Sequence, residues 1–332
     1  MKTFFLKWLA LRKLFSYNVR RDENTDNNKG ILQMKLAMIG LGKMGINLVA
    51  NLRRNGHEVV AYDLNQAAVT EATNLGAVAA TDLDDVIAQL PTPKIVWVML
   101  PAGKPTDATI QTFSEKLNAN DILIDGGNSF FEDSLKHNEL LSAQGIKFFD
   151  AGTSGGMSGA NHDGNFMIGG DDAEAFKIIE PIFEGIAQED GYLYTGKAGS
   201  GHYLKMVHNG IEYGMMQSIA EGFDVLEHGQ FDYDNEAVAK VWSNGSVIRG
   251  WLMELAQSAF SKDPNLEQLK GVMHSSGEGK WTLDEALKLQ VPTPVIAMSL
   301  MMRYRSMEDD TFTGKVVAAL RNEFGGHAVD KK

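Results

Sequence analysis

The stretch Lys35-Leu-Ala-Met-Ile39, followed at once by Gly40-Leu-Gly42-Lys-Met-Gly45, decides the fold of the first half of the chain. The first five residues form an apolar run of the size of a buried parallel strand. A helical pattern follows over Ile46–Arg54, and a second apolar run over Glu58–Tyr62 ends on Asp63. A lone glycine motif is weak evidence. A strand before it, a helix after it and an acid at this distance together predict a dinucleotide-binding βαβ unit.

The glycine segment has a physical role at each position. Gly40 and Gly42 permit a tight turn and a close approach of the backbone to a pyrophosphate, and Gly45 lets the helix pack on the strand. Lys43 and Met44 lie at the helix N-terminus, which attracts anions. We expect all five residues to contact the cofactor.

Asp63 bears on which dinucleotide binds. A carboxylate at this position accepts hydrogen bonds from the ribose hydroxyls and repels a 2′-phosphate. The next residues are Leu64, Asn65 and Gln66, so no arginine follows directly to hold that phosphate. We therefore expect NAD as the cofactor and NADP as the less favoured one.

The alternation of strands and helices continues, with strands expected near Lys94–Leu100, Asp121–Asp125, Lys147–Asp150 and Asn165–Ile168. Ligands bind at the carboxyl ends of such strands. We therefore expect Leu100, Pro101 and Asn128, in the loops after two of these strands, to contact the cofactor. Ordinary glycine turns are the alternative for either loop.

From Gly199 onward the strand signals stop and helical patterns take over, first to Gly229 and again over Asn235–Phe260. The sequence thus predicts an α/β Rossmann-type N-terminal domain at residues 34–198. An all-α C-terminal domain for substrate binding and oligomerisation is expected at residues 199–332.

Residues 1–33 differ in composition from the rest. They carry seven Lys or Arg against three Asp or Glu, whereas the whole chain has 31 against 43 and a net charge of −12. We expect a disordered, dispensable extension, with Met34 resembling a natural start. A membrane-surface anchor is the alternative.

Composition also excludes several function classes. The acidic balance disfavours general binding to nucleic acid or to an anionic membrane. The absence of cysteine excludes disulfides and thiol nucleophiles. No metal-ligand spacing and no membrane-spanning run is present, so we expect no metal and a cytoplasmic location.

One segment of the helical half carries candidate chemistry. On a helix, Lys205, His208, Asn209 and Glu212 occupy positions i, i+3, i+4 and i+7 and share one face. A solvated polar face with a Lys–Glu pairing is the alternative interpretation.

Longer motifs resemble a known family. Gly199-x-Gly201-x-x-x-Lys205-x-x-x-Asn209 resembles the catalytic-helix signature of β-hydroxyacid dehydrogenases, and Asp150-Ala-Gly-Thr-Ser-Gly-Gly156 resembles their substrate loop. The string Lys205–Gly214, together with Gly126-Gly-Asn-Ser129, is similar to the decarboxylating 6-phosphogluconate dehydrogenase family. The similarity runs from Lys35 to His327.

The resemblance implies roles for individual residues. Lys205 would be the general base and Glu212 the acid, with His208 and Asn209 completing the catalytic set. The family positions that would hold 6-phosphogluconate include His208 and Asn209 again; the full set is Asn128, Ser154, Gly155, Gly156, His208, Asn209, Tyr213, Arg303, Arg321 and His327. Arg321 and His327 match a tail that completes a neighbouring subunit's site, which implies a homodimer or tetramer.

The chain departs from the common family pattern in two ways. It is shorter than the long form, as if one helical repeat were missing near Ser306–Phe312. Glu278 also replaces a phosphate-contacting threonine, and no lysine directly precedes Gly277. This variation resembles a short, NAD-preferring branch. A non-decarboxylating 3-hydroxyacid dehydrogenase and a dinucleotide sensor without catalysis remain as alternatives.

Overall fold

The computed structural model describes residues 32–331. The expectations for the basic extension fall almost entirely on residues 1–31, which lie outside the described residues.

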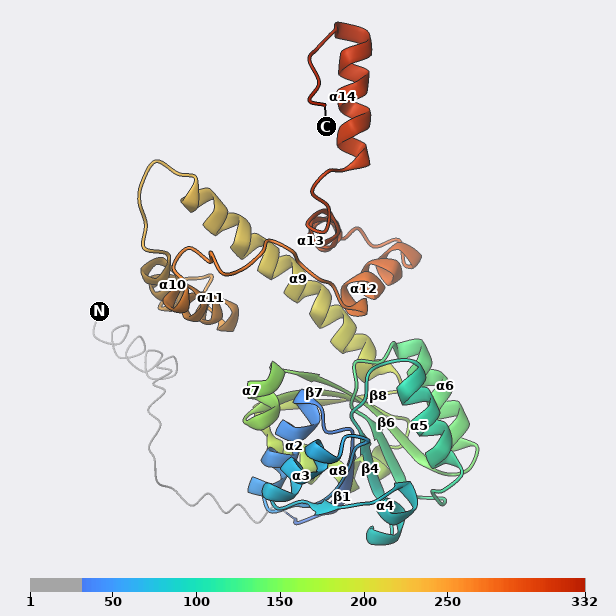
Figure 1. Ribbon diagram of the computed structural model, residues 1–332. Helices are drawn as coiled ribbons and strands as arrows, with labels where there is room; N and C mark the ends of the chain where they lie inside the picture. Colours follow the sequence, from blue (N-terminus) through green and yellow to red (C-terminus); the bar gives the residue numbers. More distant parts are fainter. Residues whose placement is uncertain (1–31, 332) are drawn as a thin grey trace, which may run out of the picture. The chain divides into compact units, whose positions relative to one another are not determined.

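The first half of the described chain is built on one eight-stranded sheet (Figure 1). Its strand order is β3-β2-β1-β4-β5-β6-β7-β8, and every neighbouring pair is parallel except β6 with β7. The first six strands follow the order of a dinucleotide-binding Rossmann sheet. The strands are β1 (Lys35–Ile39), β2 (Glu58–Tyr62), β3 (Val78–Ala79), β4 (Ile95–Val98), β5 (Ile122–Asp125), β6 (Lys147–Ser154), β7 (Gly164–Gly169) and β8 (Ala187–Gly196).

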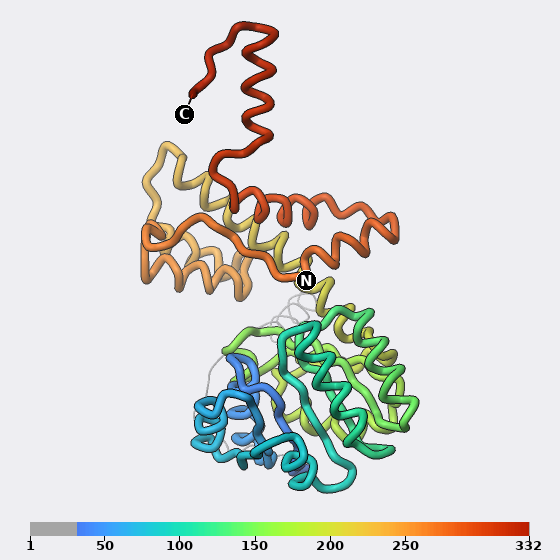
Figure 2. The backbone as a smooth tube through the Cα atoms, turned by 45° about the vertical axis from the view of Figure 1, so that its right-hand side comes forward, coloured from blue at the N-terminus to red at the C-terminus, as the bar shows by residue number. Residues whose placement is uncertain are grey.

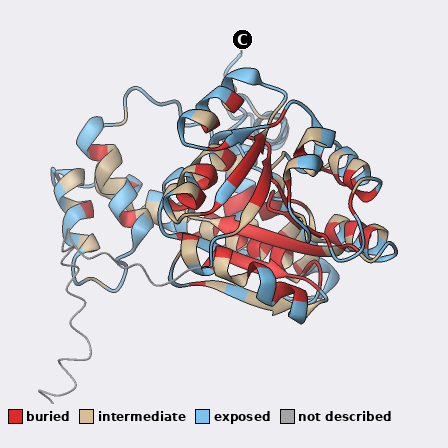
Figure 3. Ribbon diagram, turned by 90° about the horizontal axis from the view of Figure 1, so that it is seen from below, coloured by how far each residue is buried: buried red, intermediate tan, exposed pale blue. Residues whose placement is uncertain are grey.

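Helices cover both faces of the sheet, so the central strands are apolar throughout. Leu36 and Met38 of β1 belong to one hydrophobic cluster, whereas Ala37 and Ile39 belong to a second cluster on the other face. Figure 3 shows buried residues concentrated in the strands. The helices of this half are α2 (Lys43–Arg54), α3 (Gln66–Asn74), α4 (Leu83–Gln89), α5 (Lys104–Ser114), α6 (Phe131–Ser142), α7 (Gly156–Asn161) and α8 (Ala173–Ile186).

The second half is helical, as Figure 2 shows in its orange and red segments. Its helices are α9 (Ser200–Glu227), α10 (Asn235–Ser243), α11 (Trp251–Lys262), α12 (Gly277–Lys288), α13 (Pro294–Arg305) and α14 (Phe312–Gly325). The expected fold class, a Rossmann-type α/β half followed by a helical half, is confirmed. None of the helices in residues 32–331 combines the length and hydropathy that a bilayer span needs.

Helix α9 joins the two halves through three close backbone approaches. A Cβ on Gly201 would lie 2.4 Å from the Met167 carbonyl oxygen of β7, so only glycine lets the first turn rest on the sheet. Farther along the helix, Gly210 faces Thr282 of α12 and Gly214 faces Val295 of α13. The α9 backbone is thereby held against both the sheet and the helical half.

Three features differ from the pattern expected from the sequence, the first being the two-residue strand β3, which was not expected. Strand β8 was not expected, because residues 188–190 of its first half are polar and exposed. The helical run expected over Asn235–Phe260 is divided into α10 and α11 by a loop in which Gly245 and Gly250 adopt positive φ angles of 76° and 159°.

Candidate active site

A cavity of about 1130 Å³ is lined by both halves of the chain. The Rossmann half contributes the start of α2, the loops after β4 and β5, and the end of β6. The helical half contributes one face of α9 together with α11 and the loop before it. Of the residues expected at the site, the lining includes Gly42, Lys43, Met44, Gly45, Leu100, Pro101, Asn128, Ser154, Gly155, Gly156, Lys205, His208, Asn209 and Glu212.

The glycine loop has the shape that a pyrophosphate requires. Gly40 has a φ of 96°, and a Cβ there would lie 2.4 Å from the Met99 carbonyl oxygen. A Cβ on Gly45 would lie 2.0 Å from the Gly40 carbonyl oxygen, so neither glycine can be replaced without backbone movement. At Gly42, by contrast, nothing lies within 4 Å. The N-terminus of α2 therefore faces open space in which an anion fits.

Asp63 lies at the end of β2 and does not itself line the cavity. Its Oδ2 accepts a hydrogen bond from the Leu41 amide at 2.7 Å, and its Oδ1 accepts one from the Asn65 amide at 2.7 Å. These two bonds fix the carboxylate beside the glycine loop. Each oxygen retains acceptor capacity for a ribose hydroxyl.

The polar stripe of α9 forms one connected cluster in the cavity. Lys205 is 6 % exposed, and its Nζ donates to Asn209 Oδ1 at 2.8 Å and lies 3.5 Å from His208 Nδ1. His208 Nδ1 lies 3.9 Å from a carboxylate oxygen of Glu212. His208 Nε2 lies 3.1 Å from Ser154 Oγ on β6. The burial of Lys205 and Asn209 contradicts the alternative of a solvated polar face.

The β6 strand and a buried carboxylate determine where Lys205 stands. Asp150 accepts hydrogen bonds from the backbone amides of Gly199 at 2.6 Å and His202 at 2.7 Å, which anchors the start of α9. Burial raises the pKa of Asp150 above its ordinary value. A Cβ on Gly152 would lie only 2.4 Å from Lys205 Cβ, so the lysine stem rests directly on the strand.

Burial also changes the pKa of Lys205. Loss of hydration lowers the pKa of Lys205 from its ordinary value of 10.5, and the carboxylates of Glu212 and Glu278 partly oppose that shift. A lowered pKa increases the fraction of neutral amine near neutral pH, which a general base requires.

Tyr213 and Arg303, expected to hold the substrate, do not line the cavity but contact each other. The Arg303 guanidinium stacks 3.6 Å above the Tyr213 ring. The Tyr213 hydroxyl lies 3.1 Å from Ser276 Oγ and accepts from the Ser276 amide at 3.0 Å. Glu278, the departure from the family pattern, is 5 % exposed, and its Oε2 has no hydrogen-bond partner among residues 32–331.

Arg321 and His327 are not brought to the cavity of their own chain. Arg321 belongs to α14, no residue of which is buried, and His327 follows that helix. Their expected role therefore depends on a second subunit and stays a prediction.

Some lining residues were not expected from the sequence. Ile248 and Arg249 come from the α10–α11 connection and Trp251 begins α11; they line the cavity together with other α11 residues. The only sequence signal for them is the pair of glycines that interrupts the helical pattern, since interruptions of this type often mark functional loops. Within residues 32–331, no three His, Asp or Glu side chains gather as a metal site.

Comparison with known proteins places the chain in a family. The profile of the NAD-binding domain of 6-phosphogluconate dehydrogenase matches residues 35–197, and the profile of the 6-phosphogluconate dehydrogenase C-terminal domain matches residues 201–324. The Bacillus subtilis protein YqeC, provisionally named a 6-phosphogluconate dehydrogenase, is 59 % identical over 299 residues, covering 90 % of this chain and 100 % of YqeC.

Two further relatives extend the comparison. The NAD-dependent, decarboxylating 6-phosphogluconate dehydrogenase of Haloferax volcanii is 42 % identical, with 90 % of this chain and 99 % of the relative covered. The Plasmodium falciparum 6-phosphogluconate dehydrogenase structure superposes with a TM-score of 0.76 at 26 % identity, over 90 % of this chain and 67 % of that one. The chain therefore belongs to the 6-phosphogluconate dehydrogenase family.

Proposed function

We propose that the protein oxidises and decarboxylates 6-phosphogluconate to ribulose 5-phosphate and CO₂ with reduction of NAD. The observation that carries this proposal is the buried Lys205 amine, hydrogen-bonded to Asn209 in a cavity that also receives the N-terminus of α2. A base with a lowered pKa and an anion-binding helix end in one cavity suit hydride removal from a hydroxyl carbon.

The glycine loop and Asp63 suit NAD. Bound NAD supplies the hydride acceptor. The open space at Gly42 accommodates the pyrophosphate, and the Asp63 carboxylate would accept from a ribose hydroxyl and repel a 2′-phosphate. Relatives of both cofactor types exist, since a Bacillus subtilis relative at 36 % identity is named as NADP-dependent. The NAD preference therefore depends on Asp63 and not on family membership.

In the first half-reaction, Lys205 removes the proton from the C3 hydroxyl while the C3 hydride leaves. Asn209 and His208 hold the amine and would orient the hydroxyl. The product is a 3-keto acid and a protonated Lys205, whose ammonium then polarises the new carbonyl.

In the second half-reaction, the 3-keto acid loses CO₂, because the carbonyl β to the carboxylate accepts the electron pair as an enolate. The Lys205 ammonium returns its proton to the enolate oxygen and gives the enediol. Glu212 then protonates C1 while Lys205 takes the proton back from that hydroxyl, so the ketone forms. The position of Glu212 one turn beyond His208, with its side chain 38 % exposed, leaves the carboxyl able to recover a proton from solvent.

The phosphate is assigned to Arg303 and to Arg321 and His327 of a second subunit in a homodimer or larger oligomer. Helix α14 supports this assignment, because its Phe312 and Phe324 are 78 % and 77 % exposed. Exposed aromatic side chains on one helix are typical of an interface with another subunit. The expected cytoplasmic location stays a prediction.

The deciding assay measures NADH and CO₂ together from 6-phosphogluconate, with NAD and NADP compared side by side. One CO₂ for each NADH, with NAD preferred, supports the proposal. NADH without CO₂ supports a 3-hydroxyacid dehydrogenase. Tight NAD binding without turnover of any hydroxy acid supports a sensor. Lys205→Met serves as the inactive control and should keep its NAD affinity.

Subunit complementation tests the shared site. Lys205→Met and Arg321→Ala subunits should each be nearly inactive alone. If α14 of one subunit serves the other's cavity, a one-to-one co-expressed mixture regains about a quarter of wild-type activity, because half of the dimers are mixed and each has one complete site. No recovery in isolated mixed dimers would place Arg321 in its own subunit's site or outside the site.

A further inference from the structure

We infer that Asp125, which does not line the cavity, is a positioning residue that holds Asn128 in its working orientation. This inference rests on the proposed function, since it assigns to Asn128 the contacts with cofactor and substrate that the proposal requires.

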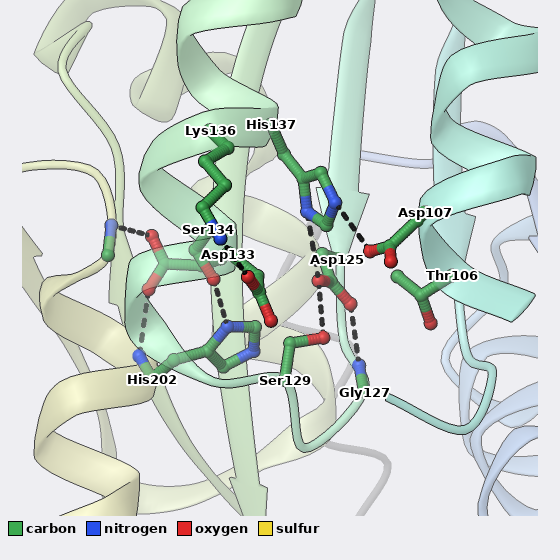
Figure 4. Close-up of polar contacts among 12 residues, drawn as sticks. Thr106, Asp107, Asp125, Gly127, Ser129, Asp133, Ser134, Lys136, His137 and His202 are labelled. Carbon is green, nitrogen blue, oxygen red and sulfur yellow. Dashed lines mark hydrogen bonds and ion pairs between the residues drawn. The ribbon is translucent and has the colours of Figure 1, made fainter. Parts of the chain in front are cut away.

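One carboxylate holds the residues on both sides of Asn128, the first through its backbone amide and the second through its hydroxyl (Figure 4). Asp125 Oδ1 accepts from the Gly127 amide at 3.1 Å, and Asp125 Oδ2 accepts from the Ser129 hydroxyl at 2.7 Å. The residues directly before and after Asn128 are therefore fixed by the same group. The backbone at Asn128 is therefore restrained on both sides, and a large displacement of the loop there requires that one of these bonds break.

The burial of the loop residues agrees with a binding role for Asn128 and a supporting role for Asp125. Residues 121–129 are all buried except Asn128, which is exposed and lines the cavity. Asp125 itself is 0 % exposed. A carboxylate is placed in such surroundings only at a cost in hydration, so the two hydrogen bonds that it accepts stabilise the loop strongly.

A histidine also lies beside Asp125. The His137 ring of α6 lies between two carboxylates, with Nε2 3.0 Å from Asp107 Oδ1 and Nδ1 4.0 Å from Asp125 Oδ2 (Figure 4). Asp107 lies in the first turn of α5, directly after the loop that carries Leu100 and Pro101. His137 therefore lies between Asp125 and the start of α5, which follows the cavity loop after β4.

The opposite end of the same strand region offers a matched control. Asp121 is 1 % exposed and accepts from the amides of Lys94 and Asn118, both at 2.8 Å. Asp121 and Asp125 are thus two buried carboxylates with two hydrogen bonds each. Only Asp125 lies at the edge where the cavity is.

The experiment compares Asp125→Ala with Asp121→Ala and with Asp125→Asn. We expect both alanine variants to lower Tm, but only Asp125→Ala to lower kcat/KM for 6-phosphogluconate, by on the order of 10- to 100-fold. Asp125→Asn should recover most of the loss, because its Oδ1 can accept from Gly127 while its Nδ2 donates to the Ser129 hydroxyl. Equal kinetic losses in the Asp121 and Asp125 variants would overturn the inference.

A double-mutant cycle with Asn128→Ala tests whether Asp125 acts through that residue. If it does, Asp125→Ala has no further kinetic effect once Asn128 is replaced, whereas additive losses contradict the inference. The dissociation constant of NADH is also measured for the wild type and the three variants of this cycle, as a second readout. If wild-type protein binds NADH but does not oxidise 6-phosphogluconate, the proposed function fails, and the NADH cycle still confirms or overturns the role of Asp125.

Discussion

Gly152 offers the sharpest test of how the sheet positions the proposed base. Replacement by alanine would place a methyl carbon 2.4 Å from Lys205 Cβ and 2.8 Å from Lys205 Cγ. Non-bonded carbons prefer a separation of about 3.5 to 4.0 Å, so the added methyl carbon and Lys205 Cβ must move apart by about 1 Å or more. The contacted atoms are at the base of the side chain, so rotation of the Lys205 amine cannot relieve the clash. Helix α9 or strand β6 must shift instead.

The expected cost follows from that displacement. A misplacement of about 1 Å can reduce turnover by about 100-fold, which corresponds to about 2.7 kcal/mol in activation free energy. Overpacking should also lower the free energy of unfolding by about 1 to 3 kcal/mol. NAD affinity should change little, because the glycine loop at Gly42 lies on other elements.

The assay is steady-state kinetics with 6-phosphogluconate and NAD, combined with thermal unfolding and NADH titration for Gly152→Ala. Gly222→Ala on the same α9 helix is the matched control, because nothing lies within 4 Å of its added Cβ. That control should raise stability by about 0.5 to 1 kcal/mol and leave kcat unchanged. If Gly152→Ala retains wild-type kcat and Tm, the β6 backbone does not determine the position of Lys205.

Three further predictions concern charge. Lys205→Met should raise Tm near neutral pH, because a buried amine with a lowered pKa destabilises the folded state. The wild-type protein should regain this stability as the pH rises from the folded-state pKa of Lys205 toward 10.5. The difference in Tm between the variant and the wild type should therefore shrink over that pH range. A Tm difference between Lys205→Met and the wild type that grows with pH would contradict this prediction. Glu278→Gln should move the acidic limb of the kcat/KM profile to lower pH, because the Glu278 carboxylate raises the pKa of Lys205; a shift to higher pH would refute that coupling. Asp63→Asn should raise the ratio of NADP to NAD specificity by about tenfold or more, since like-charge repulsion is removed; a wild type that already prefers NADP would show the ribose argument to be wrong.

Local spacing was sufficient to predict several features of the site. The Gly40–Gly45 segment and Asp63 predicted the βαβ unit, because a glycine turn between strand and helix is a short-range constraint. Helical periodicity alone placed Lys205, His208, Asn209 and Glu212 on one face, and the structure brings all four to one cavity.

Other features depended on contacts between distant segments. Whether the α9 stripe is solvated or buried is decided by Gly152 and Asp150 on β6, some fifty residues earlier in the chain. The α10–α11 loop with Arg249 reaches the cavity only through packing of the helical half, and its sequence carries no periodic signal. Strand β8 escaped prediction because exposed polar residues 188–190 interrupt its apolar pattern, and the pairing with β7 skips from Ala187 to Tyr192 at this irregularity.

The sequence by itself determined the dinucleotide-binding half and the acid expected to select NAD, because each is a property of residues within one βαβ unit. The roles of Lys205 as base and Glu212 as acid came from the family resemblance and stay predictions. Only the tertiary structure decided that Lys205 is buried with a lowered pKa and that one buried carboxylate holds both flanks of Asn128. Desolvation and hydrogen-bond geometry depend on which distant segments exclude water from a group, and no local pattern records that.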